Sequence, residues 1–175
     1  RCDHEQKCGY HFTPRDYFEQ NPSEKEKFAE NSFRSYAPIK ETRPIATSHI
    51  DLDLVNQSLR GYPANKLFQF LSVQFGETET LQLMKKYKVG TSKYWNGATV
   101  FWQTDNQNRI RTGKIMLYNP ETGKRIKEPY NHVTWVHSVL HKGDYNLRQC
   151  FFGEHLLSED KSRPVALVES EKTAL

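Results

Sequence analysis

The stretch that decides the fold is ATVFWQTDNQNRIRTGKIMLY, residues 98–118. It begins with an apolar run of β-branched and aromatic side chains over 98–102, passes through a polar segment at 104–108, and continues as a second strand-like run over 109–118. β-Branched and aromatic residues favour strands, whereas clustered Asp and Asn residues favour turns. The pattern therefore predicts two antiparallel strands joined by a polar turn.

Turn and strand signals continue downstream of this hairpin. Asn, Pro and Gly at 119–123 predict a second turn, which leads to the basic run 124–127. Residues 131–140 suit either a strand or a short helix, because periodicity does not decide between them. Gly113 is expected to bulge its strand and to change the parity before Lys114. The whole region therefore predicts an antiparallel meander.

Helices are expected upstream of the meander. Either Ser48 or Asp51 can cap the first, and Gly76 and Gly90 are the expected ends of the second and third. These helices are predicted over about 51–60, 65–74 and 78–87. Another short helix should begin at Thr13, with Pro14 at its first position. Polar residues and three prolines over 21–47 predict a linker.

Composition favours a folded chain with one main domain and an appendage. Among the 175 residues, aromatic side chains make up 13%, although the mean hydropathy is low, at −0.82. No run approaches the roughly 18 apolar residues that a membrane span requires, and the first residues show no apolar signal-peptide core. We expect a cytoplasmic protein without a membrane partner.

Positive charge is concentrated in one window, residues 93–127. Seven basic side chains face two acidic ones there, a local excess of five, whereas the whole chain has a formal net charge of +4. Such clustering is typical of surfaces that bind phosphate backbones or nucleotides, but a solvated surface of a hairpin accounts for it equally well. The candidate nucleic-acid or nucleotide contacts are Lys93, Arg109, Arg111, Lys114, Lys124 and Arg125.

The N-terminal residues contain candidate metal ligands. Cys2 and Cys8, with Gly9 after the second, have the pattern of one knuckle of a zinc ribbon, and His4 and His11 are nearby candidates for further ligands. The alternative is two reduced cysteines without metal. Cys150 lies in an apolar run and is predicted to be a small buried residue. His137 and His141 are one helical turn apart but have no third ligand, so we predict structural roles for both.

The C-terminal residues suggest a different type of sheet. Residues 152–157 predict a turn and a short helix, and the apolar run 164–168 is typical of a parallel strand that is covered on both faces. Glu169 follows that run directly. A carboxylate at the carboxyl end of such a strand can hold Mg²⁺ or accept a proton. Alternatively, Glu169 is a surface residue at the start of a helix.

The segments 151–157 and 164–175 together resemble the entry into the Toprim domain of phage-type primase–helicases and bacterial DNA primases. In that family an apolar strand ends in Val-Glu-Gly, which corresponds here to Val168, Glu169 and Ser170. The basic hairpin also resembles the N-terminal subdomain of those polymerases, which a zinc ribbon normally precedes. The likeness extends to uncharacterised Toprim proteins of mobile elements.

The resemblance implies an α+β chain of four parts. They are a partial zinc-ribbon knuckle (1–12), a short helix and polar linker (13–47), a basic primase-like subdomain with a helical segment and an antiparallel meander (48–149), and the truncated first strand and helix of a Toprim α/β domain (150–175). By the same resemblance, Glu169 is the catalytic glutamate that works beside Mg²⁺, Cys2 and Cys8 are ligands of a structural Zn²⁺, and the basic residues contact template or nucleotide phosphates.

Two departures from the family limit this expectation. Ser170 replaces the usual glycine, and the paired aspartates that the family places several tens of residues after the glutamate are absent from the sequence up to Leu175. One carboxylate cannot hold two metal ions, so we expect these residues to be inactive in phosphoryl transfer by themselves.

Three functions therefore remain open at this point. The first is a part of a primase that acts in DNA replication. The second is a non-catalytic module of a mobile element that grips single-stranded DNA by charge and by stacking on Tyr94, Trp95 and Trp102. The third is a protein-interaction module in which these aromatic residues belong to the core. Single-stranded DNA or nucleotides, and other replication or mobile-element proteins, are the expected partners.

Overall fold

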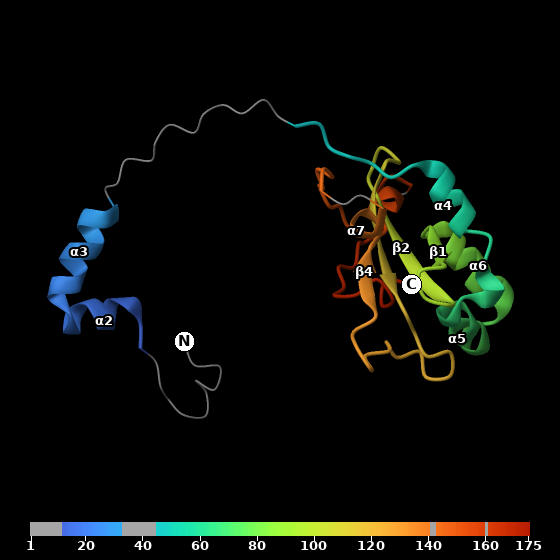
Figure 1. The fold of residues 1–175 in the computed structure, drawn as a ribbon, viewed down its shortest axis with the longest axis horizontal. Helices are drawn as coiled ribbons and strands as arrows, with labels where there is room; N and C mark the ends of the chain where they lie inside the picture. The colour runs from blue at the N-terminus through green and yellow to red at the C-terminus, as the bar shows by residue number, and fades with distance from the viewer. Residues whose placement is uncertain (1–11, 33–44, 141–142, 160) are drawn as a thin grey trace. The chain divides into compact units, whose positions relative to one another are not determined.

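The computed structural model describes residues 12–32, 45–140, 143–159 and 161–175. The chain divides into two compact units, Arg1–Pro44 and Ile45–Leu175, which Figure 1 traces from the N-terminus to the C-terminus. We call Ile45–Leu175 the main unit. The candidate ligands Cys2, Cys8, His4 and His11 lie outside the described residues.

The N-terminal unit contains two helices, α2 (Pro14–Gln20) and α3 (Pro22–Ser32). Thr13 caps α2 as predicted, because its side chain accepts a hydrogen bond from the Asp16 backbone and the Asp16 carboxylate accepts one from the Thr13 backbone. The linker prediction for 21–47 is wrong over α3. Pro22 can begin a helix, and the Glu, Lys and Ala residues that follow favour its propagation.

The main unit is built on a four-stranded antiparallel sheet in the order β1-β2-β3-β4. Its strands are β1 (Val89–Ser92), β2 (Ala98–Thr104), β3 (Ile110–Met116) and β4 (Val133–Trp135). The predicted hairpin and meander are confirmed. Gly90 does not close a helix as predicted; it lies within β1, opposite Val100.

Helices α4 (Leu52–Ser58), α5 (Lys66–Phe75) and α6 (Glu77–Lys86) precede the sheet, and a 3-10 turn, η1 (Tyr62–Ala64), separates α4 from α5. Asp51 caps α4, and Gly76 ends α5 with a φ of 88°, a conformation that favours glycine. Phe75, the last residue of α5, is 64% exposed.

Both faces of the sheet are covered. Ala98, Val100 and Trp102 of β2 pack into one core cluster with Val55 of α4. The intervening Phe101 packs on the other face, in a second cluster with residues of α5 and α6. Every residue of β2 is consequently buried. Figure 1 shows α5 and α6 close to β1, at the side of the unit away from β4.

The register of β2 and β3 contains a bulge, but not at Gly113. Gln103 pairs with Thr112 and Thr104 pairs with Ile110, which leaves Arg111 as the extra residue. Gly113 pairs regularly with Trp102, and a Cβ added there would lie 2.7 Å from the Trp102 ring. Glycine is therefore required at this position to let the ring of Trp102 cross the strand.

Short elements follow the last strand of the meander. The segment for which strand and helix were both predicted contains both, β4 followed by α7 (Val136–Leu140), and the predicted turn and helix at 152–157 become the 3-10 helix η2 (Glu154–Ser158).

The parallel strand expected at 164–168 is not formed, and that part of the predicted Toprim α/β start is corrected. Val165 and Leu167 are 71% and 80% exposed. A strand needs a hydrogen-bonded neighbour, and none of the four strands of the sheet pairs with this segment. The described architecture is α+β with an antiparallel sheet.

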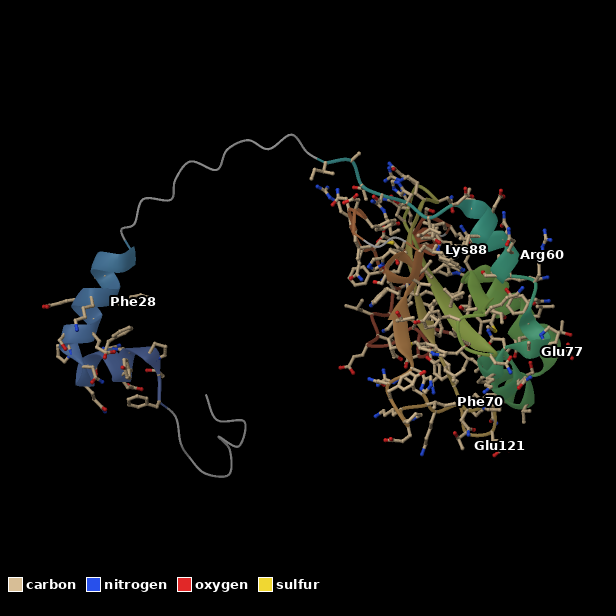
Figure 2. All side chains as sticks on the ribbon, viewed as in Figure 1. Phe28, Arg60, Phe70, Glu77, Lys88 and Glu121 are labelled. Atoms are coloured by element: carbon tan, nitrogen blue, oxygen red, sulfur yellow. The ribbon has the colours of Figure 1, made fainter. Side chains whose placement is uncertain are left out.

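Antiparallel pairing separates the two ends of the sheet. The turn at Asp105–Arg109 lies at one end, which we call the hairpin end. The β1–β2 connection at 93–97 and the segment 117–132 lie at the other, which we call the loop end, because Ser92 pairs with Ala98 and Met116 with Val133. Figure 2 shows Glu121, in the loop-end segment, far from Lys88, which bonds to Asn108 of the hairpin turn.

Candidate nucleic-acid interface

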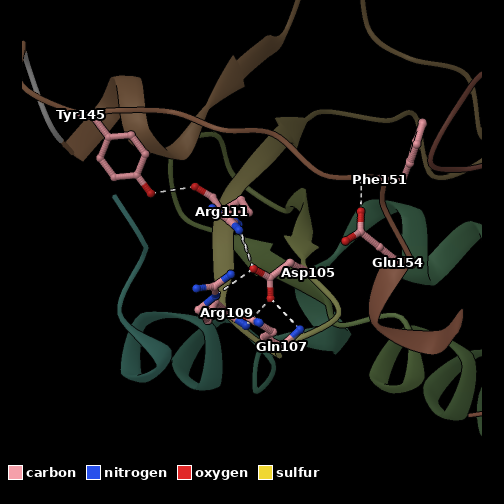
Figure 3. A network of polar contacts seen from close by, with 7 residues as sticks. All are labelled: Asp105, Gln107, Arg109, Arg111, Tyr145, Phe151 and Glu154. Carbon is pink, nitrogen blue, oxygen red and sulfur yellow. Dashed lines mark hydrogen bonds and ion pairs between the residues drawn. The ribbon is translucent and has the colours of Figure 1, made fainter. Parts of the chain in front are cut away.

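The hairpin end is organised around Asp105, whose side chain is only 3% exposed. One carboxylate oxygen accepts hydrogen bonds from the backbone N–H groups of Gln107 and Arg109, both at 2.9 Å. The other accepts from Nε of Arg109 and Nε of Arg111, also at 2.9 Å each (Figure 3). The polar residues that predicted a turn therefore include the anchor of that turn.

Electrostatics at Asp105 follow from this geometry. Burial alone would raise the pKa of the carboxyl, but hydrogen bonds from the Arg109 and Gln107 backbones, then the side chain and charge of Arg109, lower its pKa to about 2. Asp105 is thus ionised at neutral pH. Its negative charge offsets the positive charges of Arg109 and Arg111, which the sequence analysis had proposed as phosphate contacts. Arg111 is held further by its carbonyl, which accepts a hydrogen bond from the Tyr145 hydroxyl at 2.7 Å (Figure 3).

Lys114 is also paired within the chain. Its ammonium group bonds to both carboxylate oxygens of Glu171 at 3.0 and 3.1 Å and lies 5.8 Å from the centre of the Trp135 ring. The neighbouring Lys172 donates to the carbonyl of Gly123 at 2.9 Å. The C-terminal residues thereby contact both β3 and the loop-end turn, and the carboxylate that meets the sheet is Glu171. Glu169 is exposed.

The structure thus separates the six predicted binding residues into two groups. Arg109, Arg111 and Lys114 pair with buried or half-buried carboxylates. Lys93, Lys124 and Arg125 belong to the loop end, as does Lys127. Among the residues that the structure describes, these four make no ion pair; the three lysines are exposed and Arg125 is half-buried.

Four ring side chains form a continuous set at the loop end, and we call them the aromatic row. The ring centroids of Tyr94 and Trp95 are 4.7 Å apart, those of Trp95 and His132 are 5.1 Å apart, and those of His132 and Tyr130 are 4.3 Å apart. The two outer members, Tyr94 and Tyr130, are 52% and 56% exposed, whereas His132 is buried. Two segments that are distant in sequence therefore meet in one partly exposed aromatic surface.

Backbone hydrogen bonds hold the aromatic row against the sheet. The N–H of His132 donates to the carbonyl of Ile126, and the carbonyl of His132 accepts from the N–H of Leu117. On the other segment, the carbonyl of Trp95 accepts from the N–H of Ala98 at 2.9 Å, at the start of β2. Lys93 and Lys127 lie close to these anchored residues in the chain, so cationic and aromatic side chains share the loop end.

Sequence reasoning identified only part of this surface. It named Tyr94 and Trp95 but missed Tyr130 and His132, whose spacing of two residues puts both side chains on one side of an extended segment. Trp102, also named, belongs to the core, where it is 2% exposed and donates from Nε1 to the Ser58 hydroxyl at 2.9 Å. Its predicted stacking role is therefore wrong.

Other candidate groups have structural roles. Burial, followed by the charges of Glu154 and Asp105, raises the pKa of Cys150 to about 12, so its thiol stays protonated at neutral pH. Nδ1 of His137 lies 2.8 Å from the Thr112 hydroxyl, and its ring stacks on Tyr145. Within the described ranges, no group of three His, Cys, Asp or Glu side chains could hold a metal ion.

Comparison with known families supports the zinc prediction at the coarse level. Residues 1–23 match a family described as a zinc beta-ribbon finger. A structural zinc is the group that such a ribbon implies, and Cys2 and Cys8 remain its predicted thiolate ligands. This family's description does not name Toprim or primase, so that resemblance stays a prediction.

The remaining comparisons concern the whole chain. In the described part, no helix is long and apolar enough to span a membrane. No match was found among curated proteins or among solved structures. Residues 65–175, which include the whole sheet, the aromatic row and the C-terminal segment, match a domain of unknown function, DUF6371, over more than half of the chain. The chain therefore belongs to the DUF6371 family.

Proposed function

We propose that this chain binds single-stranded nucleic acid through its loop end, as part of a primase-like Toprim protein of DNA replication or mobile-element maintenance. The zinc-ribbon match at residues 1–23 is consistent with this, because a ribbon precedes the basic subdomain in the proteins that the sequence resembles. The proposal covers binding and no catalytic step. A role for Glu169 with Mg²⁺ rests on the resemblance alone.

The observation that carries the proposal is the distribution of unpaired positive charge. A cation already bonded to a buried carboxylate, as Arg109 and Arg111 are to Asp105, must break that pair to bind a phosphate. Lys93 and Lys127 carry no such cost among the described residues. The neighbouring side chains of the aromatic row offer exposed ring faces. Cationic side chains beside exposed aromatic rings are typical of sites that bind single-stranded nucleic acid.

A salt series with a fluorescent oligothymidine tests the proposal. The double variant Lys93→Ala/Lys127→Ala should bind more weakly than the parent, and the slope of log affinity against log salt should become shallower by about 1.4, roughly 0.7 for each phosphate of a single strand that is no longer neutralised. The matched control is Lys85→Ala/Arg148→Ala, which removes the same charge from exposed positions outside the loop end. Equal losses in both variants would mean that only net charge matters, contradicting the proposed site.

A second candidate is a non-catalytic protein-interaction module of a mobile element. Three exposed apolar side chains within four residues, those of Val165, Leu167 and Val168, favour it, since exposed apolar surface can mark an interface. The same titration separates the two functions. If the parent protein shows no affinity for the oligonucleotide even at low salt, nucleic-acid binding is excluded and the interaction module becomes the better explanation.

A further inference from the structure

We infer that the aromatic row is a base-stacking site that holds two bases of one strand, one on the ring of Tyr94 and one on the ring of Tyr130. This inference rests on the proposed function and deepens it, because it assigns the ligand contact to base faces as well as to phosphates. The rings of Trp95 and His132 lie between the two tyrosines in the aromatic row.

The geometry of Tyr130 carries the first step. Its ring stacks on His132 with an interplanar angle of 22° and a centroid distance of 4.3 Å, so one ring face is covered. The residue is nevertheless 56% exposed, which leaves the opposite face to solvent. A ring with one face packed on a neighbour and the other face in solvent can act as a stacking platform, because a base can stack on the open face without displacing the neighbour.

Tyr94 is held differently at the other end of the row. It meets Trp95 edge to face, with an interplanar angle of 78° and a centroid distance of 4.7 Å, and it is 52% exposed. Edge-to-face contact is a favoured aromatic geometry and restricts the ring without stacking another ring on it. Each tyrosine therefore has a ring neighbour that restricts its rotamers, which lowers the entropy lost on binding.

The separation of the two tyrosines indicates the form of the ligand. Two rings, Trp95 and His132, intervene between them, so a base on Tyr94 and a base on Tyr130 cannot belong to one continuous stack of adjacent bases. A flexible single strand can splay its bases to reach both platforms, whereas in a duplex the neighbouring base pairs cover the base faces. The site therefore suits single strands and excludes an intact double helix.

Exposed aromatic residues elsewhere in the main unit lack this arrangement. Phe75 is 64% exposed at the end of α5, and no ring neighbour accompanies it among the described residues. Substitution of Phe75 removes a similar apolar area without touching the aromatic row. It is the matched control for the tyrosines.

The test compares an eight-nucleotide oligothymidine with an abasic oligomer of the same length and charge. The parent protein should bind the oligothymidine more tightly than the abasic strand. Tyr94→Ala and Tyr130→Ala should each weaken oligothymidine binding by roughly 5- to 100-fold, the range expected for removal of one base–aromatic stack. Tyr94→Phe and Tyr130→Phe should retain most of the affinity, and Phe75→Ala should match the parent.

The outcomes separate the two levels of the proposal. If the oligothymidine and the abasic strand bind equally and the Tyr→Ala variants match the parent, base stacking is overturned while phosphate binding survives. If neither strand binds at low salt, the proposed function fails. A duplex of the same length that competes as well as the single strand would also overturn the inference. Thermal unfolding of each variant confirms that the fold is retained, since both tyrosines lie at the surface.

Discussion

Asn65 connects a helix, an edge strand and a central strand, although its side chain is completely buried. Its Oδ1 accepts hydrogen bonds from the N–H groups of Leu67 and Phe68, which caps α5, and from the Thr99 hydroxyl. Its Nδ2 donates to the carbonyl of Gly90 in β1. One amide thus satisfies polar groups that would otherwise be buried without partners.

Asn65→Ala should lower the free energy of unfolding by about 2–4 kcal/mol, because it removes a helix cap and leaves the Thr99 hydroxyl and the Gly90 carbonyl without the amide that bonds to them. Urea denaturation followed by circular dichroism measures the change. The control is Asn56→Ala on the exposed side of α4, which should change stability by less than about 0.5 kcal/mol. Equal effects at the two positions would show that the network around Asn65 has little energetic weight.

The Asp105 carboxylate should make stability depend on pH. Its pKa is about 2 in the folded protein, against an ordinary value of 3.8. Because the folded pKa is the lower one, the stabilisation is fully present above about pH 4, and it is lost as the pH falls from about 4 to 2. The difference corresponds to about 2 kcal/mol at neutral pH.

Asp105→Asn should therefore be less stable than the parent at pH 7, and the gap between the two proteins should narrow between about pH 4 and pH 2. Urea unfolding at a series of pH values in this range measures that gap. A constant difference at all pH values would show that the hydrogen-bonding shape of Asp105, and not its charge, stabilises the turn.

At the scale of elements, the C-terminal segment 170–175 is attached to the main unit by polar contacts and by Leu175, which packs against the second core cluster. Glu171 pairs with Lys114, and Lys172 bonds to Gly123. Both partners of the ion pair are partly shielded from water, with exposed fractions of 25% for Lys114 and 14% for Glu171. Shielding of this degree strengthens the pair relative to one at the open surface.

Glu171→Gln should consequently increase hydrogen–deuterium exchange of the backbone amides of Thr173 and Ala174, which donate to the Ser170 carbonyl. We expect a change of several-fold, equivalent to about 1 kcal/mol of local stability. Glu169→Gln is the control, since Glu169 is exposed and lies outside the contacts that join the segment to the sheet. Similar exchange in the two variants would mean that the ion pair does not hold the segment.

Local patterns predicted the elements that depend on local physics. Caps at Thr13 and Asp51, the helix end at Gly76 and the polar turn after β2 were all readable, because each depends on residues only a few positions apart. The strand predicted at 164–168 failed since strand formation needs a neighbour. Strand β1 (Val89–Ser92) was missed for a related reason. Its four residues form a strand only because they pair with β2, and this pairing cannot be recognised from the four residues alone.

The candidate site was predictable to a similar extent. Lys93, Tyr94 and Trp95 stand out within one short segment, but their meeting with Tyr130 and His132 depends on how the 117–132 segment returns to the sheet. Counting charges in the sequence also overestimated the number of basic side chains that are free to bind phosphate, because Arg109, Arg111 and Lys114 pair with carboxylates. Asp105 was recognised as a turn residue, and its hydrogen bonds to two arginines could be found only in three dimensions.

At the scale of the whole molecule, the main unit contains its own hydrophobic core. Both core clusters of the main unit consist of residues from position 50 onward. The N-terminal unit instead includes the zinc-ribbon match, and small metal-binding folds commonly derive much of their stability from the bound ion. Metal removal should therefore affect one unit and spare the other.

We expect the full chain to contain zinc and Cys2→Ser/Cys8→Ser to lose it, as elemental analysis would show. Adding a chelator to the full chain should change the unfolding midpoint of the main unit by less than about 2 °C, because in a unit of this size that shift corresponds to at most about 1 kcal/mol. The excised segment 45–175 should unfold at the same midpoint, with or without chelator. A fall of many degrees on chelation in the full chain, absent from the excised segment, would instead show that the zinc ribbon stabilises the main unit and that the two fold as one.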